Sequence, residues 1–196
     1  MSKWFSKDSI FHPGIVLGVI ALSVGLLLSV ANYFTKDTIA AGKEEEIASA
    51  LAQVLPTAQS FEEMPPDGAD ETITAMYIGK DASGETAGYC VQAEPSGYGG
   101  PIVMMVGIGN DGSVEGVNIT EHSETPGLGA LASEEKFSRQ YKGIKEPAKV
   151  DKDGGEIEAI TGATITSRAV TEGVNAALEA VQSLLEENGI GGAQGE

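Results

Sequence analysis

The segment from Glu158 to Arg168 reads EAITGATITSR, and the pattern of the chain changes from extended to helical within it. The apolar run from Ile157 to Ile160 is typical of a short strand, whereas apolar residues recur at helical spacing after Ser167. These residues are Val170, Val174, Ala177, Leu178, Val181 and Leu185. The segment therefore predicts a strand, a tight turn and a helix from Thr166 to Asn188.

The turn between this strand and helix combines small residues with hydroxyl groups. Gly162 and Ala163 leave room for a close approach of another backbone or a ligand. The hydroxyl groups crowd the first helical turn, where unpaired N–H groups and the positive end of the helix dipole favour an anion. They belong to Thr161, Thr164, Thr166 and Ser167. A phosphate group would fit there, although the spacing alone is equally typical of an ordinary helix N-cap.

The sequence Thr161-Gly162-Ala163-Thr164 resembles the Ser/Thr-Gly-Ala-Thr signature of FMN-binding domains that hold their flavin covalently. The resemblance implies a phosphoester between FMN and Thr164. Glu158 occupies the acidic position three residues before the first hydroxyl, where the family more often has Asp. In that family a separate magnesium-dependent flavin transferase attaches the FMN from FAD, so the resemblance implies such a transferase as a maturation partner and predicts no catalytic residue here.

Two further motifs narrow the resemblance. The first is Gly97-Tyr98-Gly99-Gly100-Pro101-Ile102, and the second is His122-Ser123-Glu124-Thr125-Pro126-Gly127-Leu128-Gly129. Together with an N-terminal apolar helix, they resemble the G subunit of the Rnf electron-transport complex, from that helix to about Asn188. The resemblance implies an electron carrier in a membrane complex that couples ferredoxin/NAD electron transfer to Na⁺ or H⁺ translocation. Its partners would be the other membrane subunits.

The resemblance also implies which residues bind the flavin. Beside the attachment point these are Thr161, Gly162, Ala163, Thr164 and Thr166, and opposite them Tyr98, His122, Glu124, Thr125, Gly127, Leu128 and Gly129. We expect the loop's N–H groups to meet the ring oxygens and N5, and Leu128 to lie on the ring face. Without the resemblance, the loop could be a plain surface turn, Tyr98 an exposed turn residue, and His122 the end of a strand. With no second histidine nearby, His122 predicts no metal site.

Length and charge limit the possible functions. The 196 residues allow one membrane anchor and one domain of about 130 to 150 residues. The net charge is −17, and 10 basic against 28 acidic residues follow the apolar span. Binding to nucleic acid needs basic clusters, so this balance argues against a nucleic-acid partner.

Cys90 is the single cysteine, and it lies in the apolar run from Ala87 to Ala93. We expect it to be a small buried hydrophobic residue. One cysteine excludes an intrachain disulfide and a cysteine-ligated iron–sulfur cluster made by this chain alone. If the protein carries electrons, a flavin must therefore carry them.

A span without charged residues runs from Gly14 to Phe34, after a short lead over residues 1–13. Its 21 residues, at about 1.5 Å each, reach about 30 Å, which is the thickness of a bilayer core. This predicts a transmembrane helix. A signal peptide cleaved after Ser29-Val30-Ala31 is the alternative, but the run exceeds the usual signal-peptide core.

The orientation of this helix cannot be read from charge. Lys3 and Lys7 precede the span while Lys36 and Lys43 follow it, so the count of basic residues is a tie. The resemblance places the N-terminus in the cytoplasm and the domain outside the membrane of a bacterial or archaeal cell.

An α+β fold is predicted beyond the span, with residues 35–71 as a helical stalk and linker. The stalk helix should run from Thr35 to Leu55 before Pro56, and Ser60 to Glu71 reads as an exposed loop. Two predicted hairpins pair Thr72–Ile78 with Glu85–Ala93, and Ile102–Ile108 with Ser113–Glu121. With a helix from Ser133, as N-cap, to Tyr141, they predict an FMN-binding domain over residues 72–188, with an antiparallel sheet and flanking helices, before a flexible tail at 189–196.

Two other functions remain open. The C subunit of a Na⁺-pumping NADH:quinone oxidoreductase shares the flavin motif but tends to be longer. A membrane-anchored assembly or binding protein without redox function could keep the fold without the flavin, although an intact Thr164 argues against it.

Overall fold

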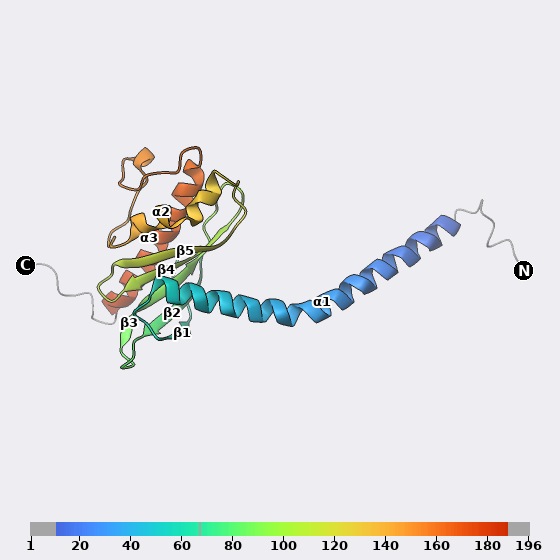
Figure 1. Cartoon of the computed structure of the whole chain (residues 1–196), viewed down its shortest axis with the longest axis horizontal. Coiled ribbons are helices and arrows are strands. Elements are labelled where there is room, and N and C mark those ends of the chain that lie inside the picture. The colour runs from blue at the N-terminus through green and yellow to red at the C-terminus, as the bar shows by residue number, and fades with distance from the viewer. Residues whose placement is uncertain (1–10, 67, 188–196) are drawn as a thin grey trace, which may run out of the picture. The chain divides into compact units, whose positions relative to one another are not determined.

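The computed structural model describes residues 11–66 and 68–187 (Figure 1). The chain divides into two compact units, residues 1–46 and residues 47–196, and helix α1 (Phe11–Val54) contributes to both. The predicted lead before residue 11 and the predicted tail at 189–196 lie outside the described residues. The two units are described separately below.

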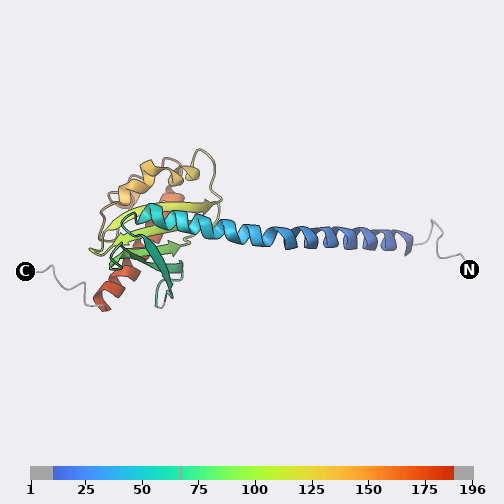
Figure 2. The same ribbon diagram turned by 60° about the horizontal axis from the view of Figure 1, so that its bottom comes forward.

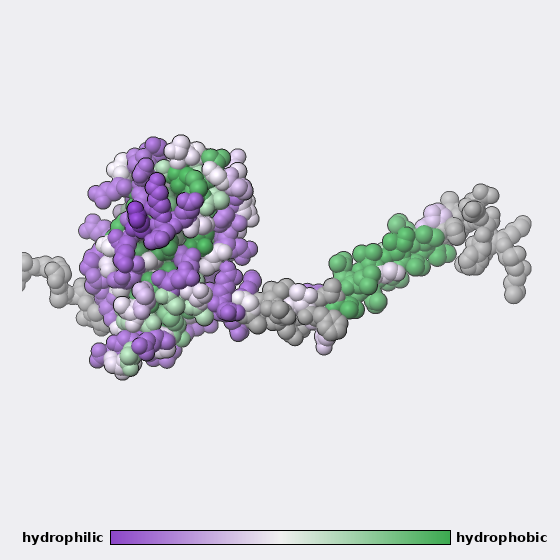
Figure 3. All heavy atoms as spheres, in the orientation of Figure 1, coloured by the Kyte–Doolittle hydropathy of each residue, from purple (hydrophilic) through white to green (hydrophobic). Residues whose placement is uncertain are grey.

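The first unit contains the apolar part of α1. Residues Pro13–Val30 have a mean hydropathy of 2.3, and none of this stretch is buried. Large apolar side chains such as those of Leu17, Leu22 and Leu26 are exposed, and Figure 3 shows a continuous apolar surface along this part of the helix. Leaving such area in water is unfavourable by about 25 cal/mol per Å². By length and composition, this helix can cross a membrane, as predicted.

The second unit is built on a five-stranded antiparallel sheet in the order β1-β2-β3-β4-β5 (Figures 1 and 2). The strands are β1 (Ser60–Met64), β2 (Ile73–Lys80), β3 (Thr86–Ala93), β4 (Ile102–Gly109) and β5 (Val114–His122). The hairpins β2–β3 and β4–β5 are confirmed. Their turns contain Gly84 and Gly112, whose φ angles of 83° and 76° lie in the left-handed region that glycine adopts readily.

The predicted loop from Ser60 to Glu71 is wrong over its first residues, because Ser60–Met64 forms the edge strand β1. Phe61 pairs with Gly79 of β2 and packs in the cluster beneath the end of α1. Lys80 Nζ lies 2.7 Å from Glu62 Oε2. The segment shows no apolar alternation, so its backbone pairing with β2 decides its conformation.

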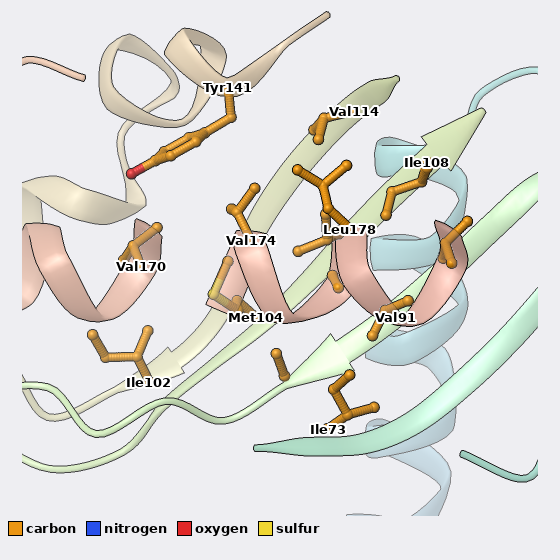
Figure 4. Close-up of a cluster of buried hydrophobic side chains, with 14 of the residues drawn as sticks. Ile73, Val91, Ile102, Met104, Ile108, Val114, Tyr141, Val170, Val174 and Leu178 are labelled. Carbon is orange, nitrogen blue, oxygen red and sulfur yellow. The ribbon is translucent and has the colours of Figure 1, made fainter. Parts of the chain in front are cut away.

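One face of the sheet is covered by α3 (Thr164–Glu187). Figure 4 shows Val170, Val174 and Leu178 of this helix facing Met104 and Val91 of the sheet. The helix is the one predicted from periodicity, and it begins at Thr164 rather than Thr166; Asn188 lies outside the described residues. This packing confirms the α+β fold class.

The opposite face holds the last turn of α1. Ala50, Leu51, Val54 and Leu55 pack with Cys90 in a second buried cluster. The thiol of Cys90 is buried as predicted, and burial raises its pKa to about 12. The end of α1 is therefore part of the core of this unit.

The segment between β5 and α3 differs from the prediction at its first helix. Residues Gly129–Ser133 form a 3₁₀ helix, and α2 covers only Glu135–Ser138, followed by a 3₁₀ turn at Arg139–Tyr141. Ser133 is not an N-cap, because Glu134 precedes α2 and no side chain caps that helix. The prediction missed that Ser133 ends a preceding 3₁₀ turn.

The predicted strand from Ile157 to Ile160 is also wrong, since it contains only an isolated bridge between Ile157 and Val150. The backbone is held by side chains instead of a neighbouring strand. The N–H of Glu158 donates to Gln140 Oε1, that of Ala159 to Asp151 Oδ1, and that of Ile160 to Ser167 Oγ. These acceptors come from distant positions, so an apolar run could not reveal them.

Candidate flavin site at the start of helix α3

A cavity of about 450 Å³ lies at the N-terminal end of α3. Three separate segments line it: the loop between β3 and β4, the loop after β5, and the turn into α3. The lining residues are Tyr98, Glu124, Thr125, Leu128, Gly129, Gly162, Ala163, Thr164, Ile165 and Thr166. The fold thus brings most of the residues predicted from the motifs around one cavity.

Ser167 fixes the turn into α3. Its N–H and its Oγ both donate to the carbonyl oxygen of Ala163 at 3.0 Å, while the same Oγ accepts from the N–H of Ile160 at 3.0 Å. Ala163 therefore precedes the helix, and Thr164 is its first residue. Thr164 is half-buried at the cavity wall.

The first turn of α3 has hydrogen-bonding capacity to spare. Within residues 11–66 and 68–187, the backbone N–H groups of Thr164, Ile165 and Thr166 have no hydrogen-bond partner. Gly162 has a φ of 81°, and a Cβ there would lie 3.1 Å from Leu128 Cδ2. Free N–H groups at the positive end of a helix attract an anion, so this turn can bind a phosphate.

Glu124 is buried at the wall of the cavity, with 6% of its surface exposed. Its Oε1 accepts hydrogen bonds from the N–H of Tyr98 at 2.7 Å and of Gly99 at 3.0 Å. Its Oε2 accepts from Thr166 Oγ1 at 2.8 Å. Both oxygens of this carboxylate are therefore engaged by the protein itself.

The loop after Glu124 is a tight turn. The carbonyl oxygen of Thr125 accepts from the N–H of Leu128 at 3.1 Å and of Ala130 at 3.2 Å. Pro126 and Gly127, with φ of 74° at the glycine, occupy the central positions, as in a type II turn. This turn leaves the Leu128 side chain 43% exposed at the cavity.

Three apolar side chains are exposed around the cavity: Tyr98 at 71%, Ile165 at 51% and Leu128 at 43%. The motifs did not identify Ile165. Its signal in the sequence is an apolar residue that stands off the buried stripe of Val170, Val174 and Leu178. A flat aromatic ring could bury these side chains.

Three of the predicted site residues do not line the cavity. His122 lies next to it and accepts the N–H of Glu124 on Nδ1 at 3.2 Å. Gly127 forms the turn just described. Thr161 lines a second cavity of about 240 Å³, together with Glu158. Among the described residues, no group of three or more histidine, cysteine, aspartate or glutamate side chains could hold a metal ion.

Two protein families match the chain. Residues 97–179 match the FMN-binding domain, and residues 1–54 match the RnfG N-terminal region. The first match contains every residue that lines the cavity, and the second ends with the last residue of α1.

Several full-length relatives are similar to the chain. The G subunit of the Na⁺-translocating ferredoxin:NAD⁺ oxidoreductase complex of Acetobacterium woodii is 38% identical over 194 residues, which cover 89% of this chain and 93% of the relative. The G subunit of the proton-translocating ferredoxin:NAD⁺ oxidoreductase complex of Clostridium ljungdahlii is 38% identical over 186 residues, with 92% and 96% covered.

Solved structures share the fold. NqrC of Shewanella oneidensis matches 75% of this chain and 98% of its own, with a TM-score of 0.59 and 17% identity. The corresponding subunit of the Na⁺-translocating NADH-quinone reductase of Parabacteroides distasonis matches with a TM-score of 0.51 and 20% identity, over 70% of this chain and 80% of its own. At these identities the likeness concerns the fold alone.

Proposed function

Because the chain belongs to the RnfG family of ion-translocating oxidoreductase complexes, we propose that it is a membrane-anchored electron carrier whose FMN is joined covalently to Thr164. It serves one step of electron transfer between ferredoxin and NAD⁺ in a complex that moves Na⁺ or H⁺. Its partners are the other membrane subunits of that complex. The observation that carries the proposal is the cavity at the start of α3, with the Thr164 hydroxyl at its wall.

The residues around the cavity fit an FMN. A volume of about 450 Å³ lies within the range of about 300–1,000 Å³ that is usual for small-molecule sites. The free N–H groups of the first turn of α3 suit the phosphate. Tyr98, Leu128 and Ile165 offer apolar surface to the ring. When bound, FMN supplies reversible electron transfer, and this chain orients it and holds it in place.

Covalent attachment follows from the position of Thr164. A threonine hydroxyl is a weak nucleophile at neutral pH, so a flavin transferase activates it. The Thr164 oxygen attacks the FMN phosphorus of FAD, a new O–P bond forms, the bond to AMP breaks, and the hydroxyl proton is lost. The products are the FMN phosphoester and AMP, and no electrons are exchanged.

Mass spectrometry after co-expression with a flavin transferase tests the attachment site. The wild-type chain should gain the mass of one FMN less one water and fluoresce in a denaturing gel, whereas Thr164→Val should show neither. Thr74→Val, which removes an exposed hydroxyl on β2, is the matched control and should be modified like the wild type. A folded wild type without flavin would refute the carrier role and favour the binding or assembly function, and a modified Thr164→Val would move the attachment elsewhere.

The position of the domain outside the cytoplasm is the remaining part of the proposal. The exposed, apolar part of α1 supports a membrane anchor, with the N-terminus in the cytoplasm. A membrane-impermeant maleimide should label Glu71→Cys in whole cells, because Glu71 is exposed on the domain. The wild type is the control, since its single thiol, Cys90, is buried. Labelling only after the cells are lysed would reverse the orientation.

A further inference from the structure

Glu124 joins three parts of the chain that are distant in sequence. It stands just after β5, its Oε1 binds two N–H groups of the loop between β3 and β4, and its Oε2 binds the first turn of α3 through Thr166. All three donors are within 3.0 Å of the carboxylate. Hydrogen bonds to a charged group are stronger than neutral ones, and a buried carboxylate is stable only where such bonds replace water.

The neighbouring glycines show how closely the chain surrounds this carboxylate. A Cβ on Gly97 would overlap Glu124 Oε1, and a Cβ on Gly129 would overlap Glu124 Oε2 and lie 2.8 Å from Thr166 Oγ1. Glycine at both positions therefore leaves space for the carboxylate and nothing larger. This explains physically why glycines flank Glu124 on both sides of the cavity.

The loop that carries Tyr98 depends on this contact. Its base is closed by the bond from Gly97 N–H to the Gly100 carbonyl oxygen and by a bridge between Ser96 and Pro101. The N–H groups of Tyr98 and Gly99, at its tip, bind Glu124. The Tyr98 side chain is itself 71% exposed. The position of Tyr98 at the cavity is thus set by the carboxylate.

We propose that Glu124 is a positioning residue, which assembles the flavin-binding wall from three segments and places a negative charge behind it. Because both of its oxygens bind the protein, Glu124 acts on the flavin through Tyr98 and Thr166 and through its charge. This role toward FMN rests on the proposed function, whereas the assembly of the wall is a property of the chain without flavin.

Hydrogen exchange of the unloaded full-length protein tests the assembly. Losing bonds to a charged acceptor in Glu124→Ala should speed exchange of the Tyr98 and Gly99 amides by about 10- to 100-fold. Glu124→Gln keeps an oxygen for those amides and can donate to Thr166 Oγ1, so it should restore protection to within about threefold of wild type. Glu121→Gln removes an exposed carboxylate of β5 and should leave both amides unchanged.

Should Glu124→Ala not fold, Glu124→Asp replaces it, because the shorter side chain keeps the charge but cannot reach all three donors. Unchanged exchange at Tyr98 and Gly99 in the folded Ala or Asp variant would overturn the proposal. So would a Gln variant that exchanges as fast as Ala. These results hold whether or not Thr164 carries flavin, so they fail or succeed separately from the proposed function.

The reduction potential of the loaded protein tests the charge, which a purely structural role would not affect. A negative charge behind the ring disfavours added electrons, so Glu124→Gln should raise the potential above that of the wild type. Glu121→Gln, being exposed and screened, should shift it less. Equal potentials for Glu124→Gln and the wild type would refute the charge effect.

Discussion

Replacing Gly107 by alanine should loosen the last turn of α1 from the sheet. Gly107 lies in β4, beneath Val54 at the end of the helix. A Cβ on Gly107 would overlap the Val54 carbonyl oxygen, and it would lie 2.6 Å from the carbonyl carbon and 3.0 Å from Val54 Cβ. Two of these atoms are backbone and cannot rotate away, so the helix end must move.

The size of the effect follows from this overlap. Inserting one methyl group into a well-packed core destabilises it by about 1–3 kcal/mol. Since about 1.4 kcal/mol corresponds to a factor of ten, the open state of this cluster should become about 5- to 150-fold more populated. Cys90 packs in the same cluster and is the single cysteine of the chain, so its exposure reports this opening directly.

The assay is the rate of Cys90 alkylation in the folded, full-length protein in detergent. The wild-type thiol should react slowly, because it is buried and its pKa is raised to about 12. Gly109→Ala is the matched control on the same strand, because its new Cβ would meet only the side-chain ends of Asp111 and Glu115, at 3.1 and 3.5 Å. It should stay within about twofold of wild type. Equal rates for the two alanine variants would refute the argument from close packing.

Two further predictions concern single polar contacts. Thr171 Oγ1 donates to a backbone carbonyl and accepts from the buried Tyr141 hydroxyl at 2.8 Å, so Thr171→Val should cost about 1–3 kcal/mol in urea unfolding by leaving that hydroxyl unpaired. Tyr141→Phe removes the hydroxyl itself and should cost less; the opposite order would contradict this reasoning. The hydrogen bond from Lys145, followed by those from Ser113, lowers the pKa of Asp111 below its ordinary 3.8, so this contribution is fully present above pH 3.8 and is lost as the pH falls through the lower folded value. Because both side chains are largely exposed, Lys145→Met should cost only about 0.2–1 kcal/mol at pH 7, and a difference in urea midpoint that persisted at pH 2 would be evidence against the pair.

Local patterns predicted the parts of the fold that local interactions decide. Gly109-Asn110-Asp111-Gly112 is a turn whatever surrounds it, and the β4–β5 hairpin forms around it. The apolar stripe of α3 likewise matches its contacts with the sheet. The strand β1 could not be predicted in this way, because its residues are polar and the backbone of β2 selects its conformation.

The same division holds at the candidate site. The motifs located Thr164 and the Glu124–Gly129 loop, since a helix start and a proline–glycine turn are local features. They did not reveal Ile165, whose exposure depends on which face of α3 the sheet buries. They also named Glu124 as a flavin contact, whereas its oxygens are occupied by Tyr98, Gly99 and Thr166.

The sequence by itself therefore determined the apolar anchor, the two hairpins, the long helix and the motif residues, because each depends on neighbours within a few positions along the chain. Only the tertiary structure decided where the buried carboxylate of Glu124 finds its donors, which lie 25, 26 and 42 positions away. It also decided that the end of α1 closes the second face of the sheet. The physical reason is that burial and hydrogen bonding over such separations depend on the packing of the whole domain.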